Sequence, residues 1–381
     1  MQNSNEDSLV STPMGNKTLL AVVVAFLFGI VATLAIRPPS QQVGGEGVAD
    51  ARTPATQVTT WRVPIAFSST WPVLGENISF VAEKIEGLSE GSLNLIIAEP
   101  QEIVPPLEIT DAVKEGKVSA GYTWLGYDRG KVPASALLGA VPFGFEPWEY
   151  SAWWYEGGGR ELAQELYAGQ NLHVILCGLI GPETAGWFRT PINSLKDLEG
   201  LKIRFAGLGG EVMQRAGASV TLLPGSEIFQ ALEKGAIDAT EFSLPVIDQA
   251  LGFEKVAKLN YFPGWHQVFT STHFVVNTDA WNGLTAQQQL LIDTTCTAAV
   301  TRNLAQAEAD QGPVIAEFKA KGVTANKIPH EILRELEKIS DQVLAEEAAN
   351  DEDFARIHES QLKFAETYSL WKDLAYLPRD F

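Results

Sequence analysis

Three stretches in the second half of the chain place a charged or amide side chain in or directly after an apolar run. Arg204 lies in "LKIRF", Glu241 follows "AIDAT", and Gln267 follows "FPGWH". A charge that is buried among apolar residues must be paired with an opposite charge or with hydrogen-bonding groups. The planar guanidinium of arginine donates two parallel hydrogen bonds to a carboxylate. These residues predict an anion site centred on Arg204, with Glu241 as an internal ion-pair partner of Arg204 as the alternative.

The glycines that follow Arg204 do not form a nucleotide-binding motif. In "GLGGEV", Val212 stands where a G-x-G-x-x-G fingerprint needs its third glycine. The sequence also contains no G-x-x-x-x-G-K-[ST] motif. We therefore interpret Gly207, Gly209 and Gly210 as a turn that lets the backbone approach a bound acid, not as a phosphate cradle.

Signatures of metal-catalytic enzymes are missing from the sequence, because H-E-x-x-H does not occur and the five histidines lack metal-ligand spacing. G-x-S-x-G occurs as "GLSEG" at 87–91, but at the end of an expected helix and not on the strand-to-helix turn that exposes a nucleophilic serine. His266 and His273 could both approach a cleft, but histidine pairs at this spacing are mostly structural. The composition also excludes a nucleic-acid-binding protein, because a net charge of −19 opposes binding to phosphates.

The N-terminus predicts export from the cytoplasm. Residues 18–36 are uncharged and mostly apolar, flanked by Lys17 and Arg37. This run is longer than the core of a typical signal peptide and close to a membrane span, so both a cleaved signal and a retained anchor stay open. Residues 37–60 are rich in Pro, Gly, Ser and Thr and predict a tether. In an oxidising compartment Cys177 and Cys296 either pair or remain two buried free thiols.

A repeated layout of helix, glycine and strand predicts two α/β lobes. It occurs in "ITDAVKEGKVSAG" (109–121) and "IFQALEKGAIDAT" (228–240), where Gly116 and Gly235 stand at the helix ends. Ligands of such sheets bind beyond the carboxyl ends of the strands, so facing lobes would enclose a site. The other expected elements are strands within 59–67, 91–100 and 201–207 and helices over 74–89, 194–200, 285–321, 330–348 and 353–376.

The order of these motifs resembles the solute-binding proteins of tripartite ATP-independent periplasmic (TRAP) transporters. The resemblance covers residue 61 to the end and rests on stretches such as "GWFRTPINSLKDLEGLKIRFAGLGG" and "IFQALEKGAIDATEF". It implies a bilobal α/β fold of the periplasmic-binding-protein type, with a long connecting helix and a helical C-terminal region. The implied boundaries are an N-terminal signal and tether over 1–60, a first lobe over 61–182 plus 269–308, and a second lobe over 183–268 plus 309–381.

The resemblance is closest to the subgroup that binds 2-oxo acids and lactate with a metal ion, and it implies a set of site residues. Arg204 would hold the ligand carboxylate. Glu241, the backbone carbonyl of Phe242, Glu183 and Gln267 would bind Na⁺ or Ca²⁺, because oxygen-only ligands suit hard ions. In relatives the position of Glu183 carries a glutamine and the position of Gln267 carries an acid, so the two side-chain types have changed places here. The alternative is that both differences are only divergence at the surface. Substrate contacts are assigned to Arg204, Glu183, Trp187, Tyr127, Trp124 and Phe242.

The implied function is capture, not catalysis. The protein would be a periplasmic receptor that delivers a 2-oxo or 2-hydroxy monocarboxylate to a TRAP membrane permease, and the C-terminal helices would form a homodimer. Two alternatives stay open: an oxo-acid-processing enzyme on the same frame, and a ligand sensor anchored by residues 18–36.

Overall fold

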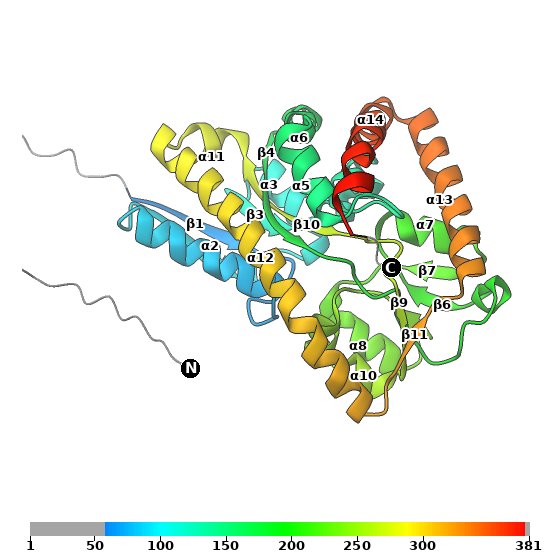
Figure 1. The fold of residues 1–381 in the computed structure, drawn as a ribbon. Coiled ribbons are helices and arrows are strands. Elements are labelled where there is room, and N and C mark those ends of the chain that lie inside the picture. Colours follow the sequence, from blue (N-terminus) through cyan, green and yellow to red (C-terminus); the bar gives the residue numbers. More distant parts are fainter. Residues whose placement is uncertain (1–57, 378–381) are drawn as a thin grey trace, which may run out of the picture. The chain divides into compact units, whose positions relative to one another are not determined.

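The computed structural model describes residues 58–377 (Figure 1). The predicted signal or anchor at 18–36 and nearly all of the tether lie outside the described residues. Within the described part of the chain, no helix is both long and apolar enough to cross a membrane.

The first sheet system is built mostly from the N-terminal half of the chain. Strand β1 (Thr59–Pro64) pairs in parallel with β2 (Leu93–Ala98). A second sheet has the order β3-β10-β4 with antiparallel pairing, and a bridge between Ile65 and Tyr122 connects it to β1. Its strands are β3 (Ala120–Thr123), β4 (Leu172–Ile180) and β10 (Thr270–Asn277). All residues of β10 are buried, as expected for a central strand.

The second sheet system contains the strands that end at or near Arg204, Trp187 and Glu241. Its order is β11-β9-β5-β8-β6-β7. The strands are β5 (Gly186–Phe188), β6 (Lys202–Arg204), β7 (Ser219–Thr221), β8 (Ala239–Thr240), β9 (Leu259–Phe262) and β11 (Thr324–Lys327). Strands β6 and β8 are parallel neighbours, with Arg204 opposite Thr240. Arg204 and Glu241 therefore come to the same edge of the sheet, as the sequence predicts.

One long helix connects the two sheet systems. Helix α12 (Ala286–Ala320) begins with a capping box at Thr285 and Gln288, which confirms the predicted helix over 285–321. In its first part, Asn303 donates to the carbonyl of Val73 at 2.9 Å. In its last part, Phe318 packs edge-on against Trp187 of β5. The fold is thus bilobal and α/β, with the connecting helix that was predicted (Figure 1).

The remaining helices cover the two sheet systems. They are α2 (Leu74–Leu88), η1 (Pro106–Glu108), α3 (Ile109–Lys114), η2 (Leu125–Gly130), α4 (Ser135–Gly139), α5 (Pro147–Glu156), α6 (Gly159–Ala168), η3 (Leu195–Leu198), α7 (Gly207–Arg215), α8 (Gly225–Glu233), α9 (Pro245–Leu251), α10 (Phe253–Val256), α11 (Thr278–Asn282), α13 (His330–Asn350) and α14 (Glu352–Ala375). Gly116 after α3 and Gly235 after α8 have φ of +71° and +72°, so both helices end on the predicted left-handed glycine.

The two C-terminal helices pack on different parts of the molecule. Helix α13 contacts α7, whereas α14 contacts α4, α5 and α6. Gln361 of α14 donates to the carbonyl of Leu137 at 2.9 Å, and Lys372 lies 2.9 Å from Glu149. The prediction assigned all of 309–381 to the second lobe, but α14 packs on helices of the first. A helix that is amphipathic by sequence does not reveal which partner its apolar face will meet.

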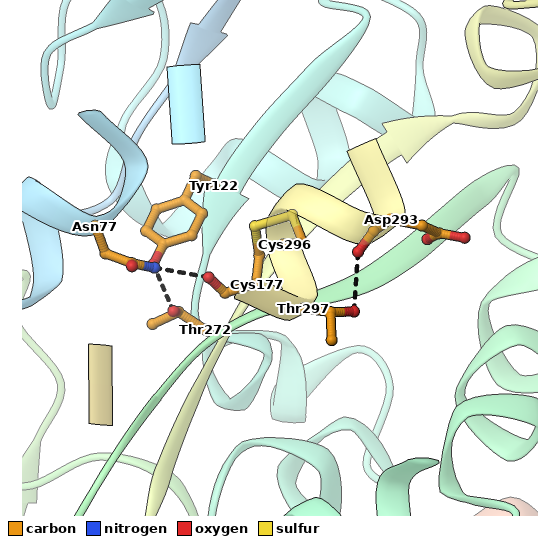
Figure 2. The surroundings of a disulfide bond; sticks show 7 residues. All are labelled: Asn77, Tyr122, Cys177, Thr272, Asp293, Cys296 and Thr297. Carbon is orange, nitrogen blue, oxygen red and sulfur yellow. Dashed lines mark hydrogen bonds between the residues drawn. A yellow bond between two sulfur atoms is a disulfide. The ribbon is translucent and has the colours of Figure 1, made fainter. Parts of the chain in front are cut away.

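The two cysteines form a disulfide between β4 and α12 (Figure 2). Cys177 and Cys296 are 119 residues apart in sequence and fully buried. Beside them, Asn77 donates to the carbonyl of Cys177 at 2.6 Å and to the hydroxyl of Tyr122 at 3.1 Å. The structure therefore selects the paired alternative, and the bond attaches the first part of α12 to the first sheet system.

Removing this cross-link should destabilise the protein without altering its site. For the Cys177→Ala/Cys296→Ala variant we expect a loss of about 2–5 kcal/mol in the free energy of unfolding, because a long loop in the unfolded chain is no longer closed. Chemical denaturation of both proteins under non-reducing conditions measures the difference. Equal unfolding midpoints would show that the bond does not stabilise the fold.

Candidate functional site

A small buried cavity lies where side chains of the two lobes meet. Its volume is about 20 Å³, so any organic acid requires the lobes to adjust, and a small acid requires the least adjustment. The lining residues are Phe67, Leu74, Trp124, Tyr127, Glu183, Arg204, Ala206, Glu241, Phe242, Ser243, Gln267 and Thr270. The structure thus brings together seven of the eight residues assigned from the sequence.

Arg204 is almost fully buried at the end of β6, with 1% of its surface exposed. Its Nη1 donates to the carboxylate and to the carbonyl of Glu241, at 2.5 and 3.0 Å. Its Nε donates to the carbonyl of Leu223 at 3.0 Å, and the guanidinium lies 5.3 Å from the ring centre of Phe242. The internal ion pair considered as the alternative is therefore present, and it holds the guanidinium at the cavity wall.

Glu241 and Glu183 each use one carboxylate oxygen for the protein and leave the other unpaired. Glu241 Oε1 accepts from Arg204 and from the backbone N–H of Ala206 at 2.6 Å. Glu183 Oε1 accepts from the hydroxyl of Thr270 at 2.8 Å. Among the residues that the structure describes, the Oε2 atoms of both glutamates have no hydrogen-bond partner although they are buried. A buried carboxylate oxygen in this state is suited to bind a cation.

The two carboxylates differ in their electrostatic settings. Burial, followed by the neighbouring Glu241, raises the pKa of Glu183 well above its ordinary value. Burial alone would also raise the pKa of Glu241, but Arg204, His266 and the Ala206 N–H together lower it. Glu241 is thus held as an anion by its partners, whereas Glu183 needs further positive charge to stay ionised.

His266 is a site residue that the sequence interpretation missed. Its Nε2 lies 3.6 Å from Glu241 Oε2 and 3.8 Å from Glu183 Oε2, and the side chain is buried. The three residues form a group able to hold a metal ion. The sequence offered one indication of this role, since His266 directly precedes the predicted ligand Gln267. An isolated histidine is usually structural, however, and Glu183 lies far from His266 along the chain.

Trp124 and Tyr127 form the apolar side of the cavity. The two rings meet edge-on with centroids 5.0 Å apart. Burial of its hydroxyl raises the pKa of Tyr127 to about 12, so the phenol is neutral. The indole of Trp124 fits against three glycines, since a Cβ added at Gly126, Gly139 or Gly207 would come within 2.2, 2.6 or 2.9 Å of it. Because Gly207 opens α7 in the second lobe, Trp124 is a contact between the lobes.

The other assigned residues have mixed outcomes. Phe242 and Gln267 line the cavity, and the carbonyl of Gln267 accepts from the N–H of Glu183 at 3.2 Å. Trp187, in contrast to the prediction of a pocket wall, does not line it. Its indole N–H donates to Asp248 at 2.7 Å and its ring packs against Phe318, so it faces the interior of the second lobe.

Comparisons with known proteins point to one family. A family model described as bacterial extracellular solute-binding protein, family 7, matches residues 68–351. A monocarboxylate 2-oxoacid-binding periplasmic protein from Nostoc is 36% identical over 314 residues, which is 82% of this chain and 85% of the relative.

Solved structures agree with this match. A TRAP solute-binding protein from Bordetella bronchiseptica, a mixed-occupancy dimer with calcium and picolinate, has a TM-score of 0.81 at 30% identity, covering 84% of this chain and 95% of its own. Another from Pseudoalteromonas atlantica, with sodium and pyruvate, has a TM-score of 0.80 at 31% identity, covering 84% and 97%.

Proposed function

The chain belongs to family 7 of the bacterial extracellular solute-binding proteins, and on that premise we propose that it captures a small 2-oxo or 2-hydroxy monocarboxylate and delivers it to a TRAP permease. As a member of this family it is an extracytoplasmic solute receptor and not an enzyme. The relative from Nostoc binds monocarboxylate 2-oxo acids, and the Pseudoalteromonas structure holds pyruvate, which supports this ligand class.

The observation that carries the proposal is the pairing of a fixed guanidinium with two unpaired carboxylate oxygens in one buried cavity. Arg204 would hold the carboxylate of the acid. A cation bound by the free oxygens of Glu183 and Glu241 would hold its 2-oxo or 2-hydroxy oxygen, and the carbonyl of Phe242 and the amide of Gln267 would complete the ligand set. Oxygen ligands suit Na⁺ or Ca²⁺, the ions present in the related structures.

Closure of the lobes would strengthen binding of the acid and would produce a form of the protein that a membrane partner can recognise. Excluding water lowers the local dielectric constant, and both the guanidinium and the cation then attract the acid more strongly. The closed form differs from the open form at the surface, so a membrane partner can select it. A sensor would need closure too; its proposed anchor at 18–36 lies outside the described residues.

Binding of pyruvate should require both Arg204 and a cation. We expect the metal-stripped chain to bind pyruvate only after a cation such as Na⁺ or Ca²⁺ is added, and the Arg204→Lys variant to bind at least about 10-fold more weakly, because lysine lacks the bidentate fork. Lysine is preferred to alanine because an unpaired Glu241 would be buried, at a cost of about 3–5 kcal/mol. Isothermal titration calorimetry measures both effects.

The matched control is Arg215→Lys, which changes the same residue type on the outside of α7. Conversion of pyruvate to a product would instead favour the enzyme alternative. Full affinity without added cation, or in Arg204→Lys, would contradict the proposed site.

Trp124 should limit the length of the acid. In the wild type we expect affinity to fall from pyruvate to 2-oxopentanoate, because the indole leaves no room for a longer chain. In Trp124→Leu this difference should shrink by about 10-fold or more, the order that one or two methylenes contribute in a fitted pocket. Calorimetric titration of both acids tests this, with the exposed Trp148→Leu as control. An identical chain-length profile in Trp124→Leu would remove Trp124 from this role.

The apolar face at the end of α14 supports the proposed homodimer. Leu370, Trp371 and Leu374 are 70%, 62% and 87% exposed, and the Bordetella relative forms a dimer. Light scattering coupled to size exclusion should give a dimeric mass for the wild type and a monomeric mass for Leu370→Glu/Leu374→Glu, because two charges oppose burial of that face. A monomeric wild type would contradict the dimer, and Leu290→Glu, which changes an exposed leucine on α12, is the control.

A further inference from the structure

Three buried side chains bring atoms without a hydrogen-bond partner close to one another, and two of them, Glu183 and Glu241, line the cavity. Glu183 Oε2, Glu241 Oε2 and His266 Nε2 have no hydrogen-bond partner in the described chain. One ligand atom from each residue lies within 4.8 Å of the others. The separations of 3.8 and 3.6 Å from Nε2 to the two carboxylates exceed hydrogen-bonding distance. Buried polar atoms without a partner destabilise a fold, so three at one place call for a shared partner.

The surroundings keep these atoms in place. The second oxygen of Glu241 is held by Arg204 and by the Ala206 N–H, and that of Glu183 by Thr270. The imidazole of His266 packs edge-on against Phe205 and Trp265, with centroids 4.7 and 5.6 Å away. Neither carboxylate can turn its free oxygen to another protein donor without giving up an existing contact. The three atoms are thus arranged in advance for a bound group.

We infer that His266 is a direct ligand of the bound cation, and that the site therefore binds Zn²⁺ more tightly than Na⁺ or Ca²⁺, the ions that its oxygen ligands alone would select. This deepens the proposed function, since the cation is the one that would bridge to the acid. Imidazole nitrogen suits Zn²⁺ and its neighbours in the first row, whereas Na⁺ and Ca²⁺ select oxygen. One nitrogen and two carboxylate oxygens also leave coordination positions open, as a site that receives a ligand requires.

The two distances from His266 Nε2 to the carboxylate oxygens fit such an ion. Two ligands at about 2.1 Å from one tetrahedral ion lie about 3.4 Å apart. The observed 3.6 and 3.8 Å therefore require shifts of only a few tenths of an ångström. Glu183, Glu241 and the carboxylate of the bound acid would carry three negative charges against the one positive charge of Arg204, and a divalent ion balances the remaining two.

Calorimetric titration of the metal-stripped 381-residue chain with Zn²⁺ and Ca²⁺, without any acid, tests the inference. We expect Zn²⁺ to bind more tightly than Ca²⁺ in the wild type. In His266→Gln, which offers an amide oxygen in place of nitrogen, Zn²⁺ affinity should fall by about 10-fold or more, given that even indirect partners of a metal contribute 10–100-fold. Ca²⁺ affinity should not fall. Undiminished Zn²⁺ affinity in His266→Gln would overturn the inference.

A spectroscopic measurement identifies the ligand directly. Electron spin-echo modulation of bound Mn²⁺ should show an imidazole nitrogen in the wild type and in the control His358→Gln, which changes a histidine of α14, but not in His266→Gln. A nitrogen signal that persists in His266→Gln assigns it to another residue and overturns the inference. If His266→Gln does not fold, as judged by circular dichroism, His266→Asn serves in both measurements.

The result is separable from the proposed function. A separate titration with pyruvate in the presence of Zn²⁺, Ca²⁺ or Na⁺ tests the receptor. Loss of pyruvate binding with every ion would defeat the receptor proposal and leave the metal measurement valid. Pyruvate binding with Na⁺ or Ca²⁺ but no Zn²⁺ binding would defeat only the inference on His266.

Discussion

The buried ion pair between Arg204 and Glu241 is the constraint on which the site depends. Two charges removed from water are tolerated only with good geometry and additional hydrogen bonds. The structure supplies these through the carbonyls of Leu223 and Glu241 and the N–H of Ala206. Because β6 and β8 are parallel neighbours, the pair joins the ends of two adjacent strands. The guanidinium is thereby fixed before any ligand arrives, which lowers the entropic cost of binding.

The long helix and its cross-link determine how the lobes are attached to each other. The disulfide and Asn303 hold the first part of α12 on the first sheet system, while Phe318 packs on the second. Arg129 of the first lobe also lies near Glu211 of α7 and Glu347 of α13. Such partly exposed ion pairs contribute little each and break readily. The covalent and buried contacts at the helix therefore attach the lobes more firmly than these ion pairs do.

Atoms of Glu183, Glu241 and His266 have no hydrogen-bond partner among the described residues, and the proposed cation would supply one. A fold selected for stability alone would pair these atoms or replace them with apolar groups. Here the Oε1 atom of each carboxylate accepts hydrogen bonds from the protein, whereas the Oε2 atom has no partner among the described residues. The raised pKa of Glu183 has the same origin, since burial next to Glu241 leaves its charge uncompensated. In the proposed receptor, these atoms would instead be satisfied when positive charge and an acid are bound together.

The sequence by itself determined several elements of the fold and the position of one central site residue. The helix over 286–320, the glycine helix ends at Gly116 and Gly235, and Arg204 at a strand end follow from patterns within a few residues, because periodicity, caps and turns are local. Three features were decided by the tertiary structure: the inward direction of Trp187, the packing of α14 and the convergence of His266 with Glu183. His266 lies between β9 and β10, whereas Glu183 lies between β4 and β5, far away in the chain. Local patterns place a side chain on an element, but only the packing of whole elements decides which side chains meet.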